Sequence, residues 1–182
     1  MSKKPKVASL FSGCGGMDAG FKQAGYELVW ANDFELSACQ TYAENFGSHI
    51  VHGDITKIDL KKIPEIDVMI GGFPCQDFSM ISKRGGIDTD RGNLYKYFVK
   101  AVQLKKPKIF VAENVKGLLT ANNGAAVKTI TDDFARIGYK VSVDLYNFAD
   151  YGVPQIRQRI FIVGVRNDVN WEFSKPEPTH VK

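Results

Sequence analysis

The chain has 182 residues, 44% hydrophobic and 24% charged, a composition typical of one globular domain with a sizeable core. The formal net charge of +4 permits a polyanionic partner without demanding one. Without an apolar run of bilayer length or a cleavable N-terminal signal, we expect a cytoplasmic protein that contacts no membrane. Three cysteines without close pairing argue against a disulfide framework and a zinc site, so we expect no metal.

Short β-rich runs alternate with helical segments, a pattern that predicts an α/β fold, doubly wound around a mostly parallel sheet. Strands are predicted at 6–11, 27–32, 49–52, 67–70, 108–112, 140–146 and 159–165. Helices are predicted at 17–24, 35–46, 93–104 and 125–137. We expect residues 1–173 to form one domain, and the proline-containing residues 174–182 to form a linker or tail.

A glycine-rich turn, FSGCGG at residues 11–16, follows the first predicted strand and opens the first helix. Glycines there allow a tight turn and close approach of a ligand to the backbone. Asp33 lies 20 residues after Gly13, where an acidic side chain binds ribose hydroxyls in such folds. The charge of Asp18 would disfavour a pyrophosphate, which favours a nucleoside cofactor without phosphates. The alternative is a turn that serves only strand-to-helix packing.

The stretch GGFPCQDFS, residues 71–79, places Cys75 just after the fourth predicted strand, at the sheet edge where ligands bind in open α/β folds. A thiol is a useful nucleophile only as a thiolate. The three histidines, His49, His52 and His180, lie at a strand or in the tail, which argues against a Cys-His hydrolase. Cys75 is therefore either a nucleophile of another kind or an inert buried thiol. Residues 81–92 are polar and glycine-containing, which predicts a mobile loop beside it.

Charged side chains are predicted at the same edge. Glu113 ends the fifth strand, and QIRQR places Arg157 and Arg159 two residues apart on what becomes a strand, where alternation puts both side chains on one face. Two arginines so placed could bind a phosphate or an acceptor oxygen. The alternatives are an acid that caps the following helix and arginines on a solvated strand.

The ordered series FSGCGG, NDF, GDI, GFPCQ, ENV and QIRQR resembles the catalytic region of DNA (cytosine-5) methyltransferases over essentially the whole chain. The resemblance implies the Rossmann-like sheet of S-adenosylmethionine-dependent methyltransferases. It also implies methylation of cytosine C5 in double-stranded DNA, as in bacterial or phage restriction-modification systems.

The family resemblance implies a role for each catalytic candidate. The Cys75 thiolate would add to cytosine C6, which activates C5 toward the methyl group. Glu113 would hydrogen-bond the N3 and N4 edge of the base. Arg159 would contact the cytosine O2, with Arg157 as its structural companion. The sequence does not indicate which base removes the C5 proton.

The implied cofactor is S-adenosylmethionine, with S-adenosylhomocysteine as product. Asp33 would hold the ribose and Phe34 would stack on adenine; many family members have glutamate at the first position and some have tryptophan at the second. The remaining implied cofactor-binding residues are Phe11, Ser12, Gly13, Cys14, Gly15 and Gly16 in the turn, Asp54 and Ile55 at the adenine edge, and Gly72, Pro74 and Leu94 in the pocket wall.

DNA contacts are implied for the segment that follows Cys75. Cytosine C6 is inaccessible in a stacked duplex, so the base must be flipped out. Residues 76–91 resemble the family's catalytic loop, which closes over DNA. Its implied DNA-binding side chains are Gln76, Ser79, Lys83, Arg84 and Arg91.

Family members of ordinary length continue into a target-recognition region and a final helix that completes the cofactor pocket. The expectations for this chain are a fragment, one subunit of a split enzyme with a second polypeptide as partner, or an inactive member. A non-catalytic module that binds cofactor or DNA stays open beside the enzyme. Within the enzyme class, tRNA stays open as a substrate.

Overall fold

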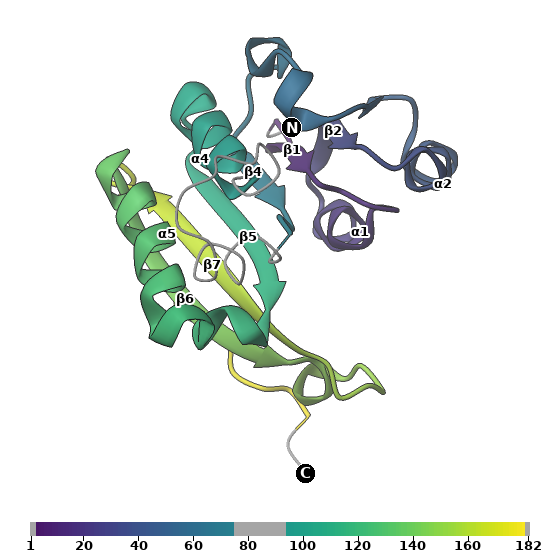
Figure 1. Cartoon of the computed structure of the whole chain (residues 1–182). Helices are drawn as coiled ribbons and strands as arrows, with labels where there is room; N and C mark the ends of the chain where they lie inside the picture. Colours follow the sequence, from purple (N-terminus) through teal and green to yellow (C-terminus); the bar gives the residue numbers. More distant parts are fainter. Residues whose placement is uncertain (1–2, 75–93, 181–182) are drawn as a thin grey trace.

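A seven-stranded sheet organises the computed structural model, which describes residues 3–74 and 94–180 (Figure 1). The strand order is β3-β2-β1-β4-β5-β7-β6. The strands are β1 Lys6–Leu10, β2 Glu27–Asp33, β3 Ile50–His52, β4 Val68–Gly71, β5 Ile109–Val115, β6 Tyr139–Asn147 and β7 Gln158–Arg166. Pairs from β3 to β5 are parallel, whereas β7 is antiparallel to β5 and β6. The predicted mostly parallel sheet is confirmed.

Helices cover both faces of the sheet (Figure 1). They are α1 Gly16–Gln23, α2 Leu36–Phe46, α4 Leu94–Lys105 and α5 Ala125–Arg136. On one face, Met17 and Phe21 of α1 pack against Val7, Val68 and Ile70 of the sheet. Side chains of α4 and α5 join the larger core on the other face. Because successive side chains of a strand point to opposite faces, β1 and β4 contribute to both cores.

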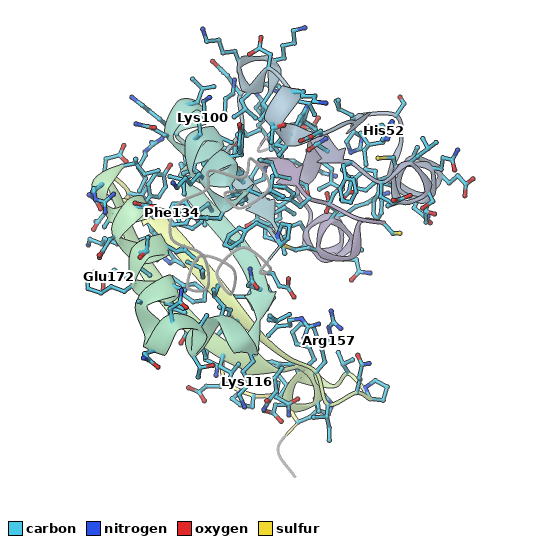
Figure 2. All side chains as sticks on the ribbon, viewed as in Figure 1. His52, Lys100, Lys116, Phe134, Arg157 and Glu172 are labelled. Carbon is cyan, nitrogen blue, oxygen red and sulfur yellow. The ribbon has the colours of Figure 1, made fainter. Side chains whose placement is uncertain are left out.

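The larger core is built around three fully buried phenylalanines, Phe98, Phe110 and Phe134. The rings of Phe110 and Phe134 stack with their centroids 4.0 Å apart, and Phe134 is labelled on α5 in Figure 2. Gly164 of β7 leaves the space for this stack, since a Cβ there would lie 1.9 Å from the Phe110 ring. A larger residue at position 164 would force the core apart.

Several short 3-10 helices complete the connections, and sequence pattern does not predict them because three or four residues show no helical period. They are η1 Ile55–Lys57, η2 Leu60–Lys62, η4 Lys116–Leu119, η5 Ala121–Gly124 and η6 Phe148–Tyr151. Asp54 and Asp59 cap the first two, where their side chains accept the backbone N–H groups of Thr56 and Lys61.

The C-terminal segment to residue 180 carries no helix or strand and lies against η6. The Asp150 carbonyl accepts the N–H groups of Thr179 and His180 at 3.0 and 2.9 Å. The Tyr151 hydroxyl donates to the Pro176 carbonyl at 3.0 Å. The domain boundary at residue 173 stays a prediction. Among the described residues, no helix is both long and apolar enough to cross a membrane.

Candidate active site

A cleft of about 1180 Å³ runs along α1, from the glycine-rich turn to Tyr26, and faces residues at the end of β4, in β5 and in β7. Its end beside the turn and β4 lies at the edge where open α/β sheets bind ligands. The cleft unites motifs that are far apart in the sequence. Predicted site residues that line it are Phe11, Ser12, Gly16, Gly72, Glu113 and Arg157.

The glycine-rich turn is held in a strained conformation beside the cleft. Phe11, Gly13 and Gly15 have φ values of 55°, 55° and 90°, which lie in the left-handed region. That region is unfavourable for phenylalanine, and such strain gathers at functional sites. The Ser12 N–H donates to the Asn32 carbonyl at 3.0 Å, and the Gly15 N–H donates to the Ser12 carbonyl at 3.0 Å. The turn is therefore fixed against the end of β2.

Asp33 ends β2 directly beside the turn and is 8% exposed. One carboxylate oxygen accepts the Gly13 N–H at 2.7 Å and the other accepts the Glu35 N–H at 3.0 Å. Each oxygen can accept a second hydrogen bond, so the same carboxylate could also receive ribose hydroxyls. The structure thus gives Asp33 a role that the sequence did not predict, as a clamp on the turn.

The other residues predicted at the adenine end occupy different environments. The Phe34 side chain is 71% exposed, which leaves its ring available for stacking. Asp54 caps η1, and its carboxylate accepts the Thr56 N–H and hydroxyl at 2.9 and 2.8 Å. Ile55 is 3% exposed and belongs to the main core. An adenine-reading role for Asp54 and Ile55 stays a prediction.

Glu113 and Arg159 form an ion pair, with 2.8 Å between Nε and the carboxylate. Antiparallel pairing places Arg159 opposite Val115, so Glu113 and Arg159 are diagonal neighbours on one face. Their side chains are 25% and 20% exposed, which shields the pair partly from water. A Cβ at Gly72 would lie 3.2 Å from the Glu113 carboxylate, so glycine lets β4 approach the pair closely.

Arg157 lies just before β7, which begins at Gln158, so strand alternation does not determine its direction. It is exposed, and its guanidinium carbon lies 6.0 Å from the centre of the Phe148 ring. In the view of Figure 2, Arg157 lies below α1, on the part of the chain that leads into β7. Arg157 thus lies one residue outside the strand, so the prediction that it shares a strand face with Arg159 stays a prediction, and Arg157 lines the cleft.

Two buried asparagines support the site without having been predicted. Asn114 donates to the Phe73 carbonyl at 2.9 Å, while its own carbonyl oxygen accepts the Val115 N–H at 2.8 Å. Asn32 donates to the Val51 and Gly53 carbonyls, both at 2.8 Å. They fix the chain just before Pro74 and just before Asp54. Asn114 lies in the motif ENV and Asn32 lies in the motif NDF, and this was the signal by which the sequence could have indicated them.

The remaining predicted residues divide into two groups. Cys14 is exposed in the turn, and Pro74 is exposed at the end of the first described range. Leu94 packs against the main core at the start of α4. Six predicted residues lie outside the described ranges: Cys75, Gln76, Ser79, Lys83, Arg84 and Arg91. Within residues 3–74 and 94–180, no group of three or more His, Cys, Asp or Glu side chains could hold a metal.

The fold and the cleft define an α/β protein of the Rossmann-like class, with a glycine turn and a carboxylate-guanidinium pair at the ligand-binding edge. The chain belongs to the family of C-5 cytosine-specific DNA methylases, whose model matches residues 5–182.

Comparisons with individual proteins agree with this assignment. Type II methyltransferase M.NgoFVII of Neisseria gonorrhoeae is 58% identical over 181 residues, covering 98% of this chain and 48% of that protein. M.BsuRI of Bacillus subtilis is 38% identical over 205 aligned residues, covering 97% and 47%. The solved structure of a putative DNA modification methyltransferase from an E. coli prophage covers 94% and 49%, with 30% identity and a TM-score of 0.79. The chain spans about half the length of these relatives.

Proposed function

We propose that the protein transfers a methyl group from S-adenosylmethionine to C5 of a flipped-out cytosine in double-stranded DNA. The observation that carries the proposal is the cleft, which places the glycine turn within one hollow with Glu113. Membership of the C-5 cytosine-specific DNA methylase family supports it. The relatives named Type II methyltransferases support a restriction-modification role in the cytoplasm of a bacterium.

The described residues fit a nucleoside cofactor. Phe11 and Ser12 line the cleft, and the exposed Phe34 ring offers a stacking surface beside the Asp33 carboxylate. S-adenosylmethionine supplies an electrophilic methyl group when it is bound, and S-adenosylhomocysteine is what remains afterwards. The residues proposed to hold it are Phe11, Ser12, Gly13, Cys14, Gly15, Gly16, Asp33, Phe34, Asp54, Ile55, Gly72, Pro74 and Leu94.

The proposed chemistry uses Cys75, which comes after β4 in the sequence, Glu113 in β5 and Arg159 in β7. The Cys75 thiolate forms a bond to cytosine C6, and the electron pair displaced toward the ring makes C5 nucleophilic. Glu113 stabilises this change by hydrogen-bonding the N3 and N4 edge, while Arg159 contacts O2 and holds Glu113 in place. After methyl transfer, a base removes the C5 proton and the C6–S bond breaks, which regenerates the thiolate. Arg157, which lines the cleft, is proposed as the structural companion of Arg159.

Covalent trapping tests this mechanism. The purified chain is incubated with S-adenosylmethionine and duplex DNA that contains 5-fluorocytosine, in which fluorine cannot leave as a proton. The wild-type protein should form an adduct that survives denaturing electrophoresis, and Cys75→Ser should form none while still binding cofactor. An adduct, or near wild-type methyl transfer, with Cys75→Ser would overturn the mechanism. Cofactor binding by wild type without an adduct would favour a module without activity of its own, and preference for tRNA over the duplex would change the substrate.

DNA recognition is proposed to involve further polypeptide. Beside the cleft, an apolar hollow of about 450 Å³ lies over β5, β6 and β7. Phe148, Phe161, Phe173 and Pro176 line both hollows, so the two adjoin. We propose that sequence beyond these residues, on the same chain or on a second polypeptide, covers this hollow and reads the target. Gln76, Ser79, Lys83, Arg84 and Arg91 are proposed to bind the DNA backbone.

Amide hydrogen exchange tests whether further polypeptide covers the apolar hollow or whether the hollow stays exposed to solvent. The amides of Phe161 and Val163 lie in β7 and should exchange similarly with and without the covering polypeptide, whereas the Phe173 amide should be protected only when that polypeptide is present. Equal exchange at Phe173 with and without that polypeptide would contradict the proposal.

A further inference from the structure

The carboxylate of Asp18 is a buried ionisable group that the proposed chemistry does not use. It lies in the first turn of α1, directly after the glycine-rich turn, and its residue is 0% exposed. Burying a carboxylate costs free energy unless hydrogen bonds compensate. Burial raises the pKa of Asp18, and hydrogen bonds from Tyr42 and Ser9 oppose that rise. An apolar side chain could fill the same space at lower cost, so the carboxylate calls for a specific explanation.

Two hydroxyl groups hold the carboxylate from different elements. Ser9 of β1 donates to one oxygen at 2.9 Å, and Tyr42 of α2 donates to the other at 2.8 Å. The Tyr42 oxygen also lies 3.1 Å from Nε2 of His49, which precedes β3. One carboxylate therefore joins β1, α1 and α2, and through Tyr42 it reaches the segment before β3.

These contacts enclose the glycine-rich turn. Ser9 and Asp18 flank residues 10–17, so their hydrogen bond closes the base of the turn. Asp33 fixes its tip through the Gly13 N–H. The ring of Tyr42 packs against the middle, where a Cβ at Gly15 would lie 3.0 Å from it. Ser9 and Asp18 also line the cleft, so a shift of either would be transmitted to the surface that a cofactor contacts.

We propose that Asp18 is a positioning residue, which acts with Ser9 and Tyr42 to hold the glycine-rich turn in the shape that binds the nucleoside cofactor. The inference rests on the proposed function, because it assigns the turn to that cofactor. Asp18 does not need to touch the cofactor or the reacting atoms. Its effect is on cofactor affinity and on the order of residues 11–16.

Tyr42→Phe is the sharpest variant because it removes the hydroxyl and keeps the ring against Gly15. Tyr139→Phe is its control: Tyr139 is 3% exposed, and its hydroxyl donates to the Pro107 carbonyl at 2.6 Å, away from the cleft. Dissociation constants for S-adenosylmethionine and S-adenosylhomocysteine are measured by calorimetry on the purified chain. Tyr42→Phe should weaken both by about fivefold to tenfold, as expected for the loss of one hydrogen bond. Tyr139→Phe should bind like wild type.

Backbone exchange supplies a readout that does not depend on the cofactor. Without cofactor, the Gly13 and Gly15 amides should exchange faster in Tyr42→Phe than in Tyr139→Phe, although both variants lose one buried hydrogen bond. Ser9→Ala is the second variant, should Tyr42→Phe fail to fold, and it should show the same direction. Unchanged affinity and exchange in the folded variants would overturn this inference alone. Failure of the folded wild-type chain to bind cofactor would overturn the proposed function, and this inference with it.

Discussion

At the scale of single residues, the pair formed by Glu113 and Arg159 is the most directly testable part of the site. Glu113→Gln removes the charge that Arg159 contacts at 2.8 Å and weakens the proposed hydrogen bond to the base. Methyl transfer should fall by about a hundredfold or more, the range found for general acid-base groups. Radiolabel incorporation into DNA measures it.

The matched control is Glu172→Gln, which breaks the exposed ion pair with Lys140 at 3.2 Å. This pair lies away from the cleft, and exposed pairs contribute little to stability. The control should therefore keep wild-type methyl transfer. Equal losses in Glu113→Gln and Glu172→Gln would mean that removing charge, and not the site, causes the effect.

A second residue-scale prediction concerns Asn114, which is 2% exposed. Asn114→Leu removes the hydrogen bond to the Phe73 carbonyl and leaves that buried oxygen without this partner. The free energy of unfolding should decrease by about 1–3 kcal/mol, measured by denaturant titration. Asn45→Leu is the control, because Asn45 is exposed and its side chain donates to the Thr41 carbonyl within α2. A loss with Asn45→Leu as large as that with Asn114→Leu would contradict the assigned role.

The sequence predicted the positions of some of these residues but not the hydrogen bonds that they make. Glu113 and Asp33 could be placed because each lies near the carboxyl end of a strand, and the carboxyl ends of parallel strands share one sheet edge. The clamp from Asp33 to the Gly13 N–H and the Asn114 bond could not be predicted, since both depend on backbone groups meeting after folding. Arg157 lies just before β7, and a strand start is not defined to one residue by sequence pattern.

At the scale of elements, two adjacent glycines in the turn between β1 and α1 should differ in how much their substitution by alanine lowers the free energy of unfolding. Gly15 has φ of 90°, and a Cβ there would lie 2.3 Å from the Phe46 ring. Gly15→Ala should lower the free energy of unfolding by about 2–4 kcal/mol through left-handed strain and overpacking. Gly16 meets nothing within 4 Å, so Gly16→Ala should stay within about 0.5 kcal/mol of wild type. Thermal or urea unfolding compares the two, and equal effects would contradict the packing described.

The elements themselves were predictable because their hydrophobic patterns are strong. All seven predicted strands and four predicted helices are present, each with ends within a few residues. The sequence pattern did not predict that β7 runs antiparallel to β5 and β6, because the hydrophobic pattern of one strand does not indicate which strands it pairs with. The 3-10 helices were missed because three or four residues show no helical period, although Asp54 and Asp59 cap η1 and η2.

At the scale of the whole molecule, stability should depend on pH through His49. Burial lowers the pKa of His49; nearby Asp18 opposes this and Lys22 adds to it. The unfolded chain binds this proton near pH 6.5, whereas the folded chain does so only at lower pH. The free energy of unfolding should therefore decrease as pH falls below about 6.5, because the unfolded state then holds more protons.

Urea titrations from pH 8 to pH 5.5 measure this dependence. His49→Gln should flatten the profile, and His52→Gln, on the exposed end of β3, should leave it unchanged. A profile that keeps its slope in His49→Gln would assign the effect to other groups.

At the same scale, the chain spans about half the length of its curated relatives, and its described residues line a cleft. Residues of α1 lie on one side of this cleft, and residues of β5 and β7 lie on the other. We proposed above that further polypeptide covers the adjoining apolar hollow. Because this hollow and the cleft are lined by different sets of residues apart from the four that they share, the proposed cofactor binding can be tested separately from the proposed target reading.

Equilibrium dialysis of radiolabelled S-adenosylmethionine against the purified chain tests the central claim most directly. We predict saturable binding of one cofactor per chain, competed by S-adenosylhomocysteine and not by the phosphate-bearing nucleotides ATP or NAD. Binding should be weakened in Asp33→Ala. No saturable binding by the folded chain, or displacement by ATP and NAD as effective as that by S-adenosylhomocysteine, would contradict the assignment of the cleft.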